Sequence, residues 1–339
     1  MSEKLKVIVT DYIEKDLNWE ALELAGDPVD FIPKQLKHVS QDKLIDAIAD
    51  ADILVVNMAR INREVLAELK NCKLIIRHGA GYDNIDVDSA QVFGIGVAYV
   101  PDYCSEEVAE QAQLLLMTSW RKFSTQLDVM KESVTKGHWH FDPVKPLKRM
   151  AGCKVGLIGC GRIGSISLKM LRGLGFDVLV CDPYLTEERQ DELGVITLTL
   201  EEMLPQVDVV TLHCSLTKET RNLISRKELA LMKNSAILIN TARGAVVDTN
   251  ALASAIKLNQ IGGAGIDVYD QEPPAIDFPL IGLDGVILTP HLSWYSEDAE
   301  WSIRKKILED IRLCLNGLAP RFPINEIARK PSQSPGSEA

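Results

Sequence analysis

Arg243, Glu272 and His291 are the residues best suited to chemistry, and each follows a short apolar run typical of a buried strand. Loops that follow neighbouring parallel strands gather at one edge of the sheet, and ligands of such sheets bind there. An imidazole can give and take a proton near neutral pH, and a guanidinium binds a carboxylate through two parallel hydrogen bonds. With a nicotinamide as hydride carrier, these side chains would suit the oxidation or reduction of a substrate that carries a carboxylate.

Each of the three residues also has an ordinary structural interpretation. An arginine near a strand end often forms a surface ion pair. A glutamate before two prolines, such as Glu272, is commonly a solvated loop residue, and a histidine after a proline, such as His291, is more often structural. Three such residues after three strands of one sheet would be an improbable coincidence, so their combination favours a catalytic site.

A glycine-rich segment in the middle of the chain predicts a dinucleotide site. Gly159, Gly161 and Gly164 form the pattern G-x-G-x-x-G after the apolar run 155–158, and the next apolar run ends at Asp182. This order provides a tight turn, a close approach of the backbone to a pyrophosphate, and a helix N-terminus that faces the phosphates. Asp182 lies 18 residues after Gly164, near the roughly 20 expected for a ribose-binding carboxylate, and its charge favours NAD over NADP. The alternative is an ordinary glycine-rich turn.

The elements that must position these residues are short apolar runs that alternate with segments of helical length. They form two series, and each series is typical of a doubly wound parallel α/β sheet. The first series comprises residues 5–9, 53–56, 74–76 and 97–100, and the second comprises residues 155–158, 178–181, 209–212, 237–239 and 286–288. Residues 106–123 and 296–315 predict long helices, and we expect the second helix to return the chain to the first domain.

Composition limits the class of protein. The chain has 339 residues, enough for two domains of moderate size, with 46% apolar and 25% charged residues. A formal net charge of −11 disfavours nucleic acid and anionic membranes as partners. No apolar run approaches the roughly 18 residues of a membrane span, and the N-terminus lacks the pattern of a signal peptide. Seven cysteines without a C-x-x-C pair indicate a reducing compartment, so we expect a soluble cytoplasmic protein.

The motifs together resemble those of the D-isomer-specific 2-hydroxyacid dehydrogenases, up to about residue 325. The resemblance rests on the glycine pattern, on the arginine, glutamate and histidine motifs, and on residues 77–86, 100–110 and 212–217. Within that family the chain is most similar to the C-terminal-binding-protein corepressors and their bacterial relatives. Residues 289–297 carry this likeness, because they read Thr-Pro-His-Leu-Ser-Trp-Tyr-Ser-Glu where most of the wider family has glycines after the histidine.

The resemblance implies a role for each residue of the site. His291 would be the acid–base residue, Glu272 would hydrogen-bond its other ring nitrogen and keep the proton available near neutrality, and Arg243 would bind the substrate carboxylate. The first domain would hold the same carboxylate through Arg77, Gly79, Ala80 and Gly81. The residues implied for the NAD site, where Asp267 would bind the nicotinamide amide, are Val108, Gly159, Gly161, Arg162, Ile163, Gly164, Asp182, His213, Thr217, Thr241, Ala242, Arg243, Asp267 and His291.

Three residues depart from the family pattern. Ser215 stands where a proline is usual, so that the turn after His213 is expected to be looser. Val108 removes one hydrogen bond that a hydroxyl residue could make to the cofactor. Trp294 is expected to line the substrate pocket and to favour apolar substituents, and the alternative is a tryptophan that packs in the core or at a hinge.

By resemblance, we expect an α/β fold with two doubly wound parallel sheets, in which a Rossmann NAD domain of residues 103–293 is inserted into a flavodoxin-like substrate domain. Residues 1–102 and 294–330 would form that substrate domain, and residues 331–339 would be a disordered tail. Residues 123–149 would arch over the partner subunit of a homodimer.

No metal is expected, because His138 and His140 lack a carboxylate or cysteine at ligand spacing. The competing function is an NAD-sensing scaffold that binds proteins, as in the corepressors, and the identity of the 2-oxo acid stays open.

Overall fold

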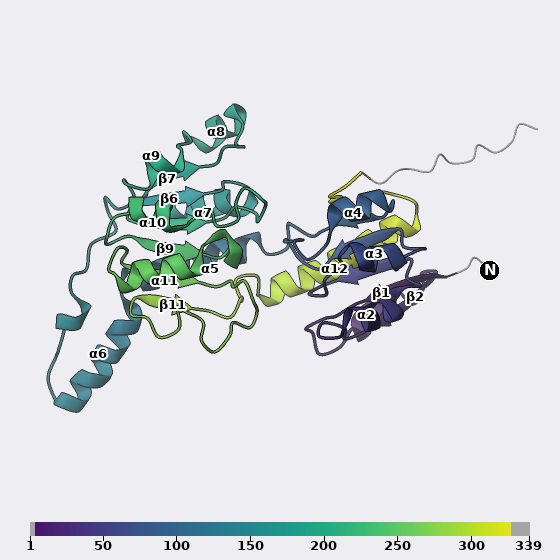
Figure 1. Ribbon diagram of the computed structural model, residues 1–339, viewed down its shortest axis with the longest axis horizontal. Helices are drawn as coiled ribbons and strands as arrows, with labels where there is room; N and C mark the ends of the chain where they lie inside the picture. Colours follow the sequence, from purple (N-terminus) through teal and green to yellow (C-terminus); the bar gives the residue numbers. More distant parts are fainter. Residues whose placement is uncertain (1–3, 327–339) are drawn as a thin grey trace, which may run out of the picture. The chain divides into compact units, whose positions relative to one another are not determined.

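The structure is a computed structural model that describes residues 4–326, and these fall into two compact units (Figure 1). Unit 1 comprises the residues up to Tyr103 and from Ser296 onward, and unit 2 comprises Cys104–Tyr295. Each unit is built on one parallel sheet with helices, which confirms the predicted fold class. The two unit boundaries lie one and two residues later than the sequence placed them.

Unit 1 has a five-stranded sheet in the order β2-β1-β3-β4-β5. Its strands are β1 (Leu5–Val9), β2 (Val29–Pro33), β3 (Ile53–Val56), β4 (Leu74–Arg77) and β5 (Gly96–Ala98), and its helices are α1 (Asn18–Glu23), α2 (Gln41–Ile48), α3 (Arg63–Glu68), α4 (Val87–Val92) and α12 (Glu297–Leu315). All residues of the central strand β3 are buried and aliphatic, as a parallel strand covered on both faces requires. Ile303, Ile307 and Ile311 place α12 in the core of this unit.

Unit 2 has a six-stranded sheet in the order β11-β10-β9-β8-β6-β7. Its strands are β6 (Lys154–Ile158), β7 (Asp177–Cys181), β8 (Val209–Leu212), β9 (Ile237–Asn240), β10 (Gly263–Ile266) and β11 (Val286–Leu288). Its α-helices are α5 (Ser105–Trp120), α6 (Phe123–Lys136), α7 (Arg162–Gly173), α8 (Glu187–Leu193), α9 (Leu200–Met203), α10 (Arg226–Leu231) and α11 (Thr249–Lys257), with 3₁₀ turns η1 (Asp142–Val144) and η2 (Gly244–Val246).

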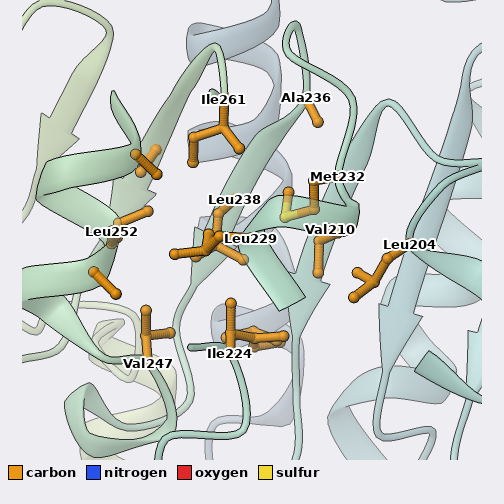
Figure 2. Close-up of a cluster of buried hydrophobic side chains, with 14 of the residues drawn as sticks. Leu204, Val210, Ile224, Leu229, Met232, Ala236, Leu238, Val247, Leu252 and Ile261 are labelled. Atoms are coloured by element: carbon orange, nitrogen blue, oxygen red, sulfur yellow. The ribbon is translucent and has the colours of Figure 1, made fainter. Parts of the chain in front are cut away.

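Two clusters of buried side chains form the core of unit 2, one on each face of its sheet. In the cluster of Figure 2, Val210 of β8 and Leu238 of β9 pack against Leu229 of α10 and Leu252 of α11. The other cluster is built around Leu115 and Leu116 of α5. The sheet is therefore held between two apolar layers, and only the loops at its edges are left to bind ligands.

One predicted helix differs from the structure. Residues 106–123 were expected to form a single helix, but α5 ends at Trp120 and a second helix, α6, begins at Phe123. Lys122 between them has a positive φ of 49°, which no helix interior tolerates, so the chain turns there. None of the helices within residues 4–326 is both long and apolar enough to cross a bilayer.

Candidate active site

Three adjacent strands of unit 2 bring the predicted catalytic residues to one edge of the sheet. The strands β9, β10 and β11 are neighbours, and Ile266 pairs with Asn240 on one side and with Leu288 on the other. The chain leaves β9 toward Arg243, leaves β10 toward Glu272 and leaves β11 toward His291. Because the strands are parallel, all three loops start at the same edge.

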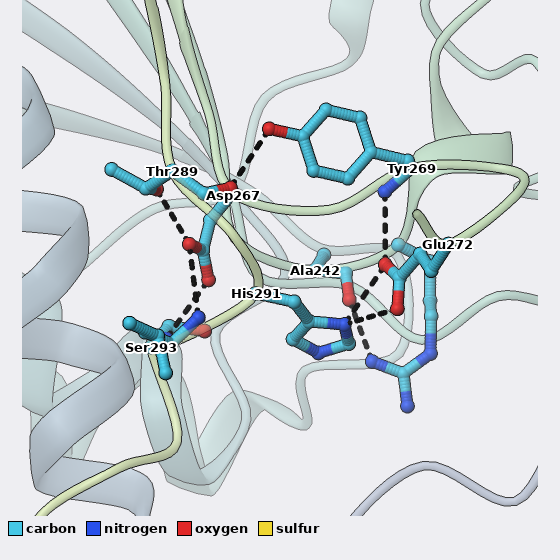
Figure 3. A network of polar contacts seen from close by, with 9 residues as sticks. Ala242, Asp267, Tyr269, Glu272, Thr289, His291 and Ser293 are labelled. Atoms are coloured by element: carbon cyan, nitrogen blue, oxygen red, sulfur yellow. Dashed lines mark hydrogen bonds and ion pairs between the residues drawn. The ribbon is translucent and has the colours of Figure 1, made fainter. Parts of the chain in front are cut away.

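His291 and Glu272 form the central contact of this edge (Figure 3). The Nδ1 atom of His291 lies 2.7 Å from Oε2 and 2.9 Å from Oε1 of Glu272. The backbone N–H of Tyr269 donates to Oε1 of the same carboxylate at 3.1 Å. Partial burial alone would raise the pKa of Glu272, but its hydrogen bond to His291 and the nearby positive charges hold that pKa below its ordinary value. The carboxylate is therefore ionised and holds the imidazole of His291 through its Nδ1 atom.

Asp267 and Tyr269 hold the loop that carries His291. Asp267 is fully buried, and its carboxylate accepts hydrogen bonds from the hydroxyl of Thr289 at 2.5 Å and from the backbone N–H groups of Leu292 and Ser293 at 3.2 and 2.9 Å. The hydroxyl of Tyr269 donates to the carbonyl of Thr289 at 2.8 Å. These bonds fix the chain on both sides of His291, whose positive φ of 54° needs such support. The expected contact of Asp267 with a nicotinamide stays a prediction.

Arg243 lies on a loop that is packed tightly against the loop of Glu272. A Cβ atom on the next residue, Gly244, would lie 2.2 Å from the backbone of Tyr269, so only glycine permits this approach. Asn240 fixes the same loop, because its side chain accepts from the N–H of Ala242 at 3.0 Å and donates to the carbonyl of Arg243 at 2.9 Å. The charge of Arg243 is one of those that lower the pKa of Glu272, so the arginine lies within electrostatic reach of the pair.

The glycine pattern forms the turn that a dinucleotide needs. Gly159 has a φ of 86°, and a Cβ there would lie 2.7 Å from the backbone nitrogen of Cys214. A Cβ on Gly164 would lie 2.1 Å from the carbonyl oxygen of Gly159. The start of α7 can therefore pack this closely against the turn after β6 only because residue 164 is glycine. Around the Cβ position of Gly161, which precedes α7, no described atom beyond its own chain neighbours lies within 4 Å. The N-terminus of α7 therefore has the open approach that a pyrophosphate requires.

Two residues predicted for the cofactor site have a buried polar atom without a partner. The described residues include five such side-chain atoms, which belong to Asp102, Gln113, Ser119, His213 and Thr241. Buried polar groups are nearly always paired, so the Nδ1 atom of His213 and the hydroxyl of Thr241 fit a bound ligand. Burial lowers the pKa of His213 to about 4, which favours the neutral ring at neutral pH.

The structure shows where the other predicted residues lie. The carboxylate of Asp182 accepts from the N–H of Cys160 at 2.7 Å and from the N–H of Tyr184 at 3.0 Å, so it also braces the glycine turn. The hydroxyl of Thr217 accepts from the N–H groups of Glu219 and Thr220, both at 3.2 Å, within its own turn. Arg162 and Ile163 are the first residues of α7, and Val108 is buried in α5. Ala242 precedes Arg243 and accepts a hydrogen bond from its side chain. Trp294 lies in unit 2 beside Tyr295.

Arg77, Gly79, Ala80 and Gly81 belong to unit 1, where Arg77 is the last residue of β4 and the other three lie in the loop that follows. Sequence reasoning missed Tyr269, whose backbone and side chain brace both loops of the pair. Its only signal was an aromatic residue between Asp267 and Glu272.

Comparisons with known proteins show the family to which this chain belongs. The family "D-isomer specific 2-hydroxyacid dehydrogenase, NAD binding domain" matches residues 114–293. The D-3-phosphoglycerate dehydrogenase of Methanocaldococcus jannaschii is 35% identical over 315 residues, which cover 92% of this chain and 58% of that protein. The glyoxylate reductase of Korarchaeum cryptofilum is 35% identical over 289 residues, which cover 85% of this chain and 86% of that protein.

Among solved structures, the D-lactate dehydrogenase of Aquifex aeolicus, complexed with NAD and lactic acid, matches with a TM-score of 0.82 and 28% identity. The match covers 92% of this chain and 96% of that one. The chain spans little more than half the length of the curated phosphoglycerate dehydrogenases that it matches, 58% and 55% for two of them.

Proposed function

The chain belongs to the D-isomer specific 2-hydroxyacid dehydrogenases, and on that premise we propose that it reduces the carbonyl of a small 2-oxo acid with NADH. The observation that carries the proposal is the hydrogen-bonded pair of His291 and Glu272, which is braced by Asp267 and Tyr269. A proton donor held in this way has one ring nitrogen fixed by a carboxylate and the other directed at the substrate.

In the proposed reduction, His291 holds a proton on Nε2 and releases it to the substrate oxygen. Glu272 stabilises the protonated ring, because an ionised carboxylate within hydrogen-bond distance favours the imidazolium. In the reverse reaction the neutral ring takes the proton back from the hydroxyl group. Arg243 binds the substrate carboxylate and orients the carbonyl, a task that suits a planar guanidinium better than an ammonium group.

The NAD site is proposed for the residues at the carboxyl ends of β6, β7, β8 and β9. Gly161, Arg162 and Ile163 at the start of α7 would bind the pyrophosphate. Asp182 would accept the ribose hydroxyls, and the orphaned hydroxyl of Thr241 is available to the cofactor. When bound, the nicotinamide supplies the hydride or accepts it.

For the loop of Gly79, Ala80 and Gly81 in unit 1, we propose binding of the substrate carboxylate through backbone N–H groups, with Arg77 as the accompanying cation. A loop of small residues leaves its N–H groups accessible to an anion.

A panel of 2-oxo acids tests the proposed reaction. Glyoxylate, hydroxypyruvate, pyruvate and a bulkier apolar 2-oxo acid are each offered with NADH, and oxidation of NADH is followed by absorbance. We expect at least one of them to be reduced, and reduction should disappear in Arg243→Ala and His291→Gln. If the protein binds NADH but reduces none of the panel, the scaffold function replaces the enzyme.

A homodimer is the proposed assembly, and the segment after α6 is the proposed interface. A groove on unit 2 is lined by Gln126, Val129, Met130, Trp139, Phe141, Val144, Lys145 and Leu147. Trp139 and Phe141 stack on each other with ring centroids 5.9 Å apart, yet they are 66% and 58% exposed. Large exposed aromatic side chains beside an apolar groove mark an interaction surface, and a second copy would bury them.

We also propose a cytoplasmic location, which the seven free and mostly buried cysteines support.

A further inference from the structure

The guanidinium of Arg77 lies against the backbone of the loop that follows β4. A Cβ atom on Gly79 would lie 2.5 Å from Nη1 and 2.9 Å from Cζ of Arg77, so any side chain at this position would displace the guanidinium. Gly79 also has a φ of 154°, which side chains disfavour. Nη1 donates to the carbonyl of His78. The guanidinium of Arg77 can therefore lie this close to the loop only because residue 79 is glycine.

Asn84 holds the other side of this guanidinium. Its Oδ1 atom accepts a hydrogen bond from Nε of Arg77 at 3.2 Å. Its Nδ2 atom donates to the backbone carbonyls of Asn57 and Ala59 at 3.0 and 2.9 Å, which fixes the orientation of the amide. The carbonyl of Asn84 accepts from the N–H of Ile61 at 2.9 Å. Asn84 is thus anchored on the turn after β3 and presents its remaining oxygen to Arg77.

Asp11 fixes that turn from the side of β1. Its two carboxylate oxygens accept from the backbone N–H groups of Met58 and Ala59 at 2.7 and 3.1 Å. Asp11 is 2% exposed and also accepts from the hydroxyl of Thr10 at 2.7 Å. The segments after β1, β3 and β4 are therefore joined by hydrogen bonds that include the guanidinium of Arg77.

We propose that Asn84 is a positioning residue, which holds the Arg77 guanidinium against Gly79 in the orientation that receives the substrate carboxylate. This inference rests on the proposed function, because it concerns binding of the 2-oxo acid. An amide can orient a guanidinium without adding a negative charge that would repel the substrate, whereas an aspartate at the same place could not. The ordering of Arg77 before binding reduces the entropy lost on binding, and the gain belongs to substrate affinity.

The variants Asn84→Ala, Asn84→Asp, Arg77→Ala and the double variant Arg77→Ala/Asn84→Ala test the inference. The matched control is Asn62→Ala, since Asn62 also fixes backbone in unit 1 by accepting from the N–H of Val65 at 3.1 Å, without contacting Arg77. For each protein we would measure KM and kcat for the best 2-oxo acid of the panel, the Kd of NADH by fluorescence, and the midpoint of thermal unfolding.

We expect Asn84→Ala to raise KM by about tenfold, a typical coupling between contacting residues, while kcat and the Kd of NADH change less than about twofold. The double variant should have the KM of Arg77→Ala alone, because Asn84 acts only through the arginine. Asn84→Asp should raise KM further than Asn84→Ala, since its charge opposes the anionic substrate. Asn62→Ala should lower the unfolding midpoint and leave KM unchanged.

Additive effects in the double variant, or a KM of Asn84→Ala equal to that of the wild type, would overturn the positioning role while the enzymatic function stands. If Arg77→Ala also leaves KM unchanged, the assignment of Arg77 to the substrate fails and the role of Asn84 fails with it. A wild type that reduces no 2-oxo acid overturns the proposed function and the inference together.

Discussion

The proton that His291 would deliver depends on the charge of Glu272, which the hydrogen bond to His291 and the nearby cations keep ionised. In Glu272→Gln this charge is lost, and the imidazolium loses the partner that stabilises it. An imidazolium is less stable without a neighbouring negative charge, so we expect the pH–rate profile for reduction to move to lower pH. Steady-state rates of NADH oxidation between acid and weakly basic pH measure this shift.

Two comparisons make that result specific. His291→Gln should lower turnover about 10²–10⁴-fold, the usual contribution of a placed acid, and should leave the Kd of NADH nearly unchanged. A profile for Glu272→Gln that keeps its position, with only a smaller amplitude, would remove the charge of Glu272 from the mechanism.

Trp294 is the residue where the sequence is most individual. Its ring lies edge-on to Tyr295, with centroids 5.3 Å apart, and it is half-buried in unit 2. If it forms a wall of the substrate pocket, Trp294→Ala should reduce the preference for a bulky apolar 2-oxo acid over glyoxylate by about 10- to 200-fold in kcat/KM. Equal losses for both substrates, together with a lower unfolding midpoint, would make it a packing residue. Tyr295→Ala is the neighbouring control.

At the scale of elements, the sequence predicted the bounds of strands that are continuous aliphatic runs, missed β2, and indicated β10 only by the apolar end of its segment before Glu272. β2 (Val29–Pro33) lies at the edge of its sheet, where Pro33 costs no ladder bond, so the strand lacks a continuous apolar run. β10 (Gly263–Ile266) consists mostly of small residues because α5 packs on it. A Cβ on Gly265 would lie 3.0 Å from atoms of Ile239 and Leu115. Such contacts depend on the tertiary structure and leave no periodic pattern.

The meeting of three predicted site residues at one sheet edge, by contrast, could be predicted from the sequence. Arg243 and His291 lie three residues after β9 and β11, Glu272 lies six residues after β10, and the strand order brings these loops to one edge. The hydrogen bonds of Asp267 to the loop of His291 were not predictable, since they depend on loop conformations with a positive φ at His291. Sequence therefore indicates which residues meet, and structure indicates what holds them.

The turn between β6 and α7 is joined to the end of β7 by Asp182, so this one carboxylate serves both the loop and the predicted ribose site. Asp182→Asn keeps an oxygen acceptor for the N–H of Cys160 and removes the charge, whereas Asp182→Ser shortens the side chain as well. Both should narrow the preference for NADH over NADPH by about tenfold or more, the range of a hydrogen bond to a charged group. Fluorescence titrations of both cofactors measure this change, and Asp191→Asn in α8 is the control for lost charge. A wild type that binds NADPH as tightly as NADH would contradict the assignment.

At the scale of the molecule, α6 shows why part of a fold has no pattern in its own sequence. Of its residues, only Val129 and Ser133 are buried, while Leu127, Met130 and Val134 are between about half and two thirds exposed. A helix stabilised only by its own chain would hide these side chains. In the proposed dimer a second copy would cover these side chains, and such contacts have no counterpart in the packing of the single chain.

The dimer is tested by charge placed in the apolar groove. Trp139→Asp and Phe141→Asp would bury an unpaired carboxylate at the interface, which is costly enough to separate the subunits. Sedimentation velocity should then show monomers where the wild type is dimeric, with an unchanged far-ultraviolet spectrum. Ile276→Asp is the matched control, because Ile276 is 98% exposed on unit 2 and lies outside the groove. A wild type that stays monomeric at high concentration would refute the assembly, and α6 would then need a partner of another kind.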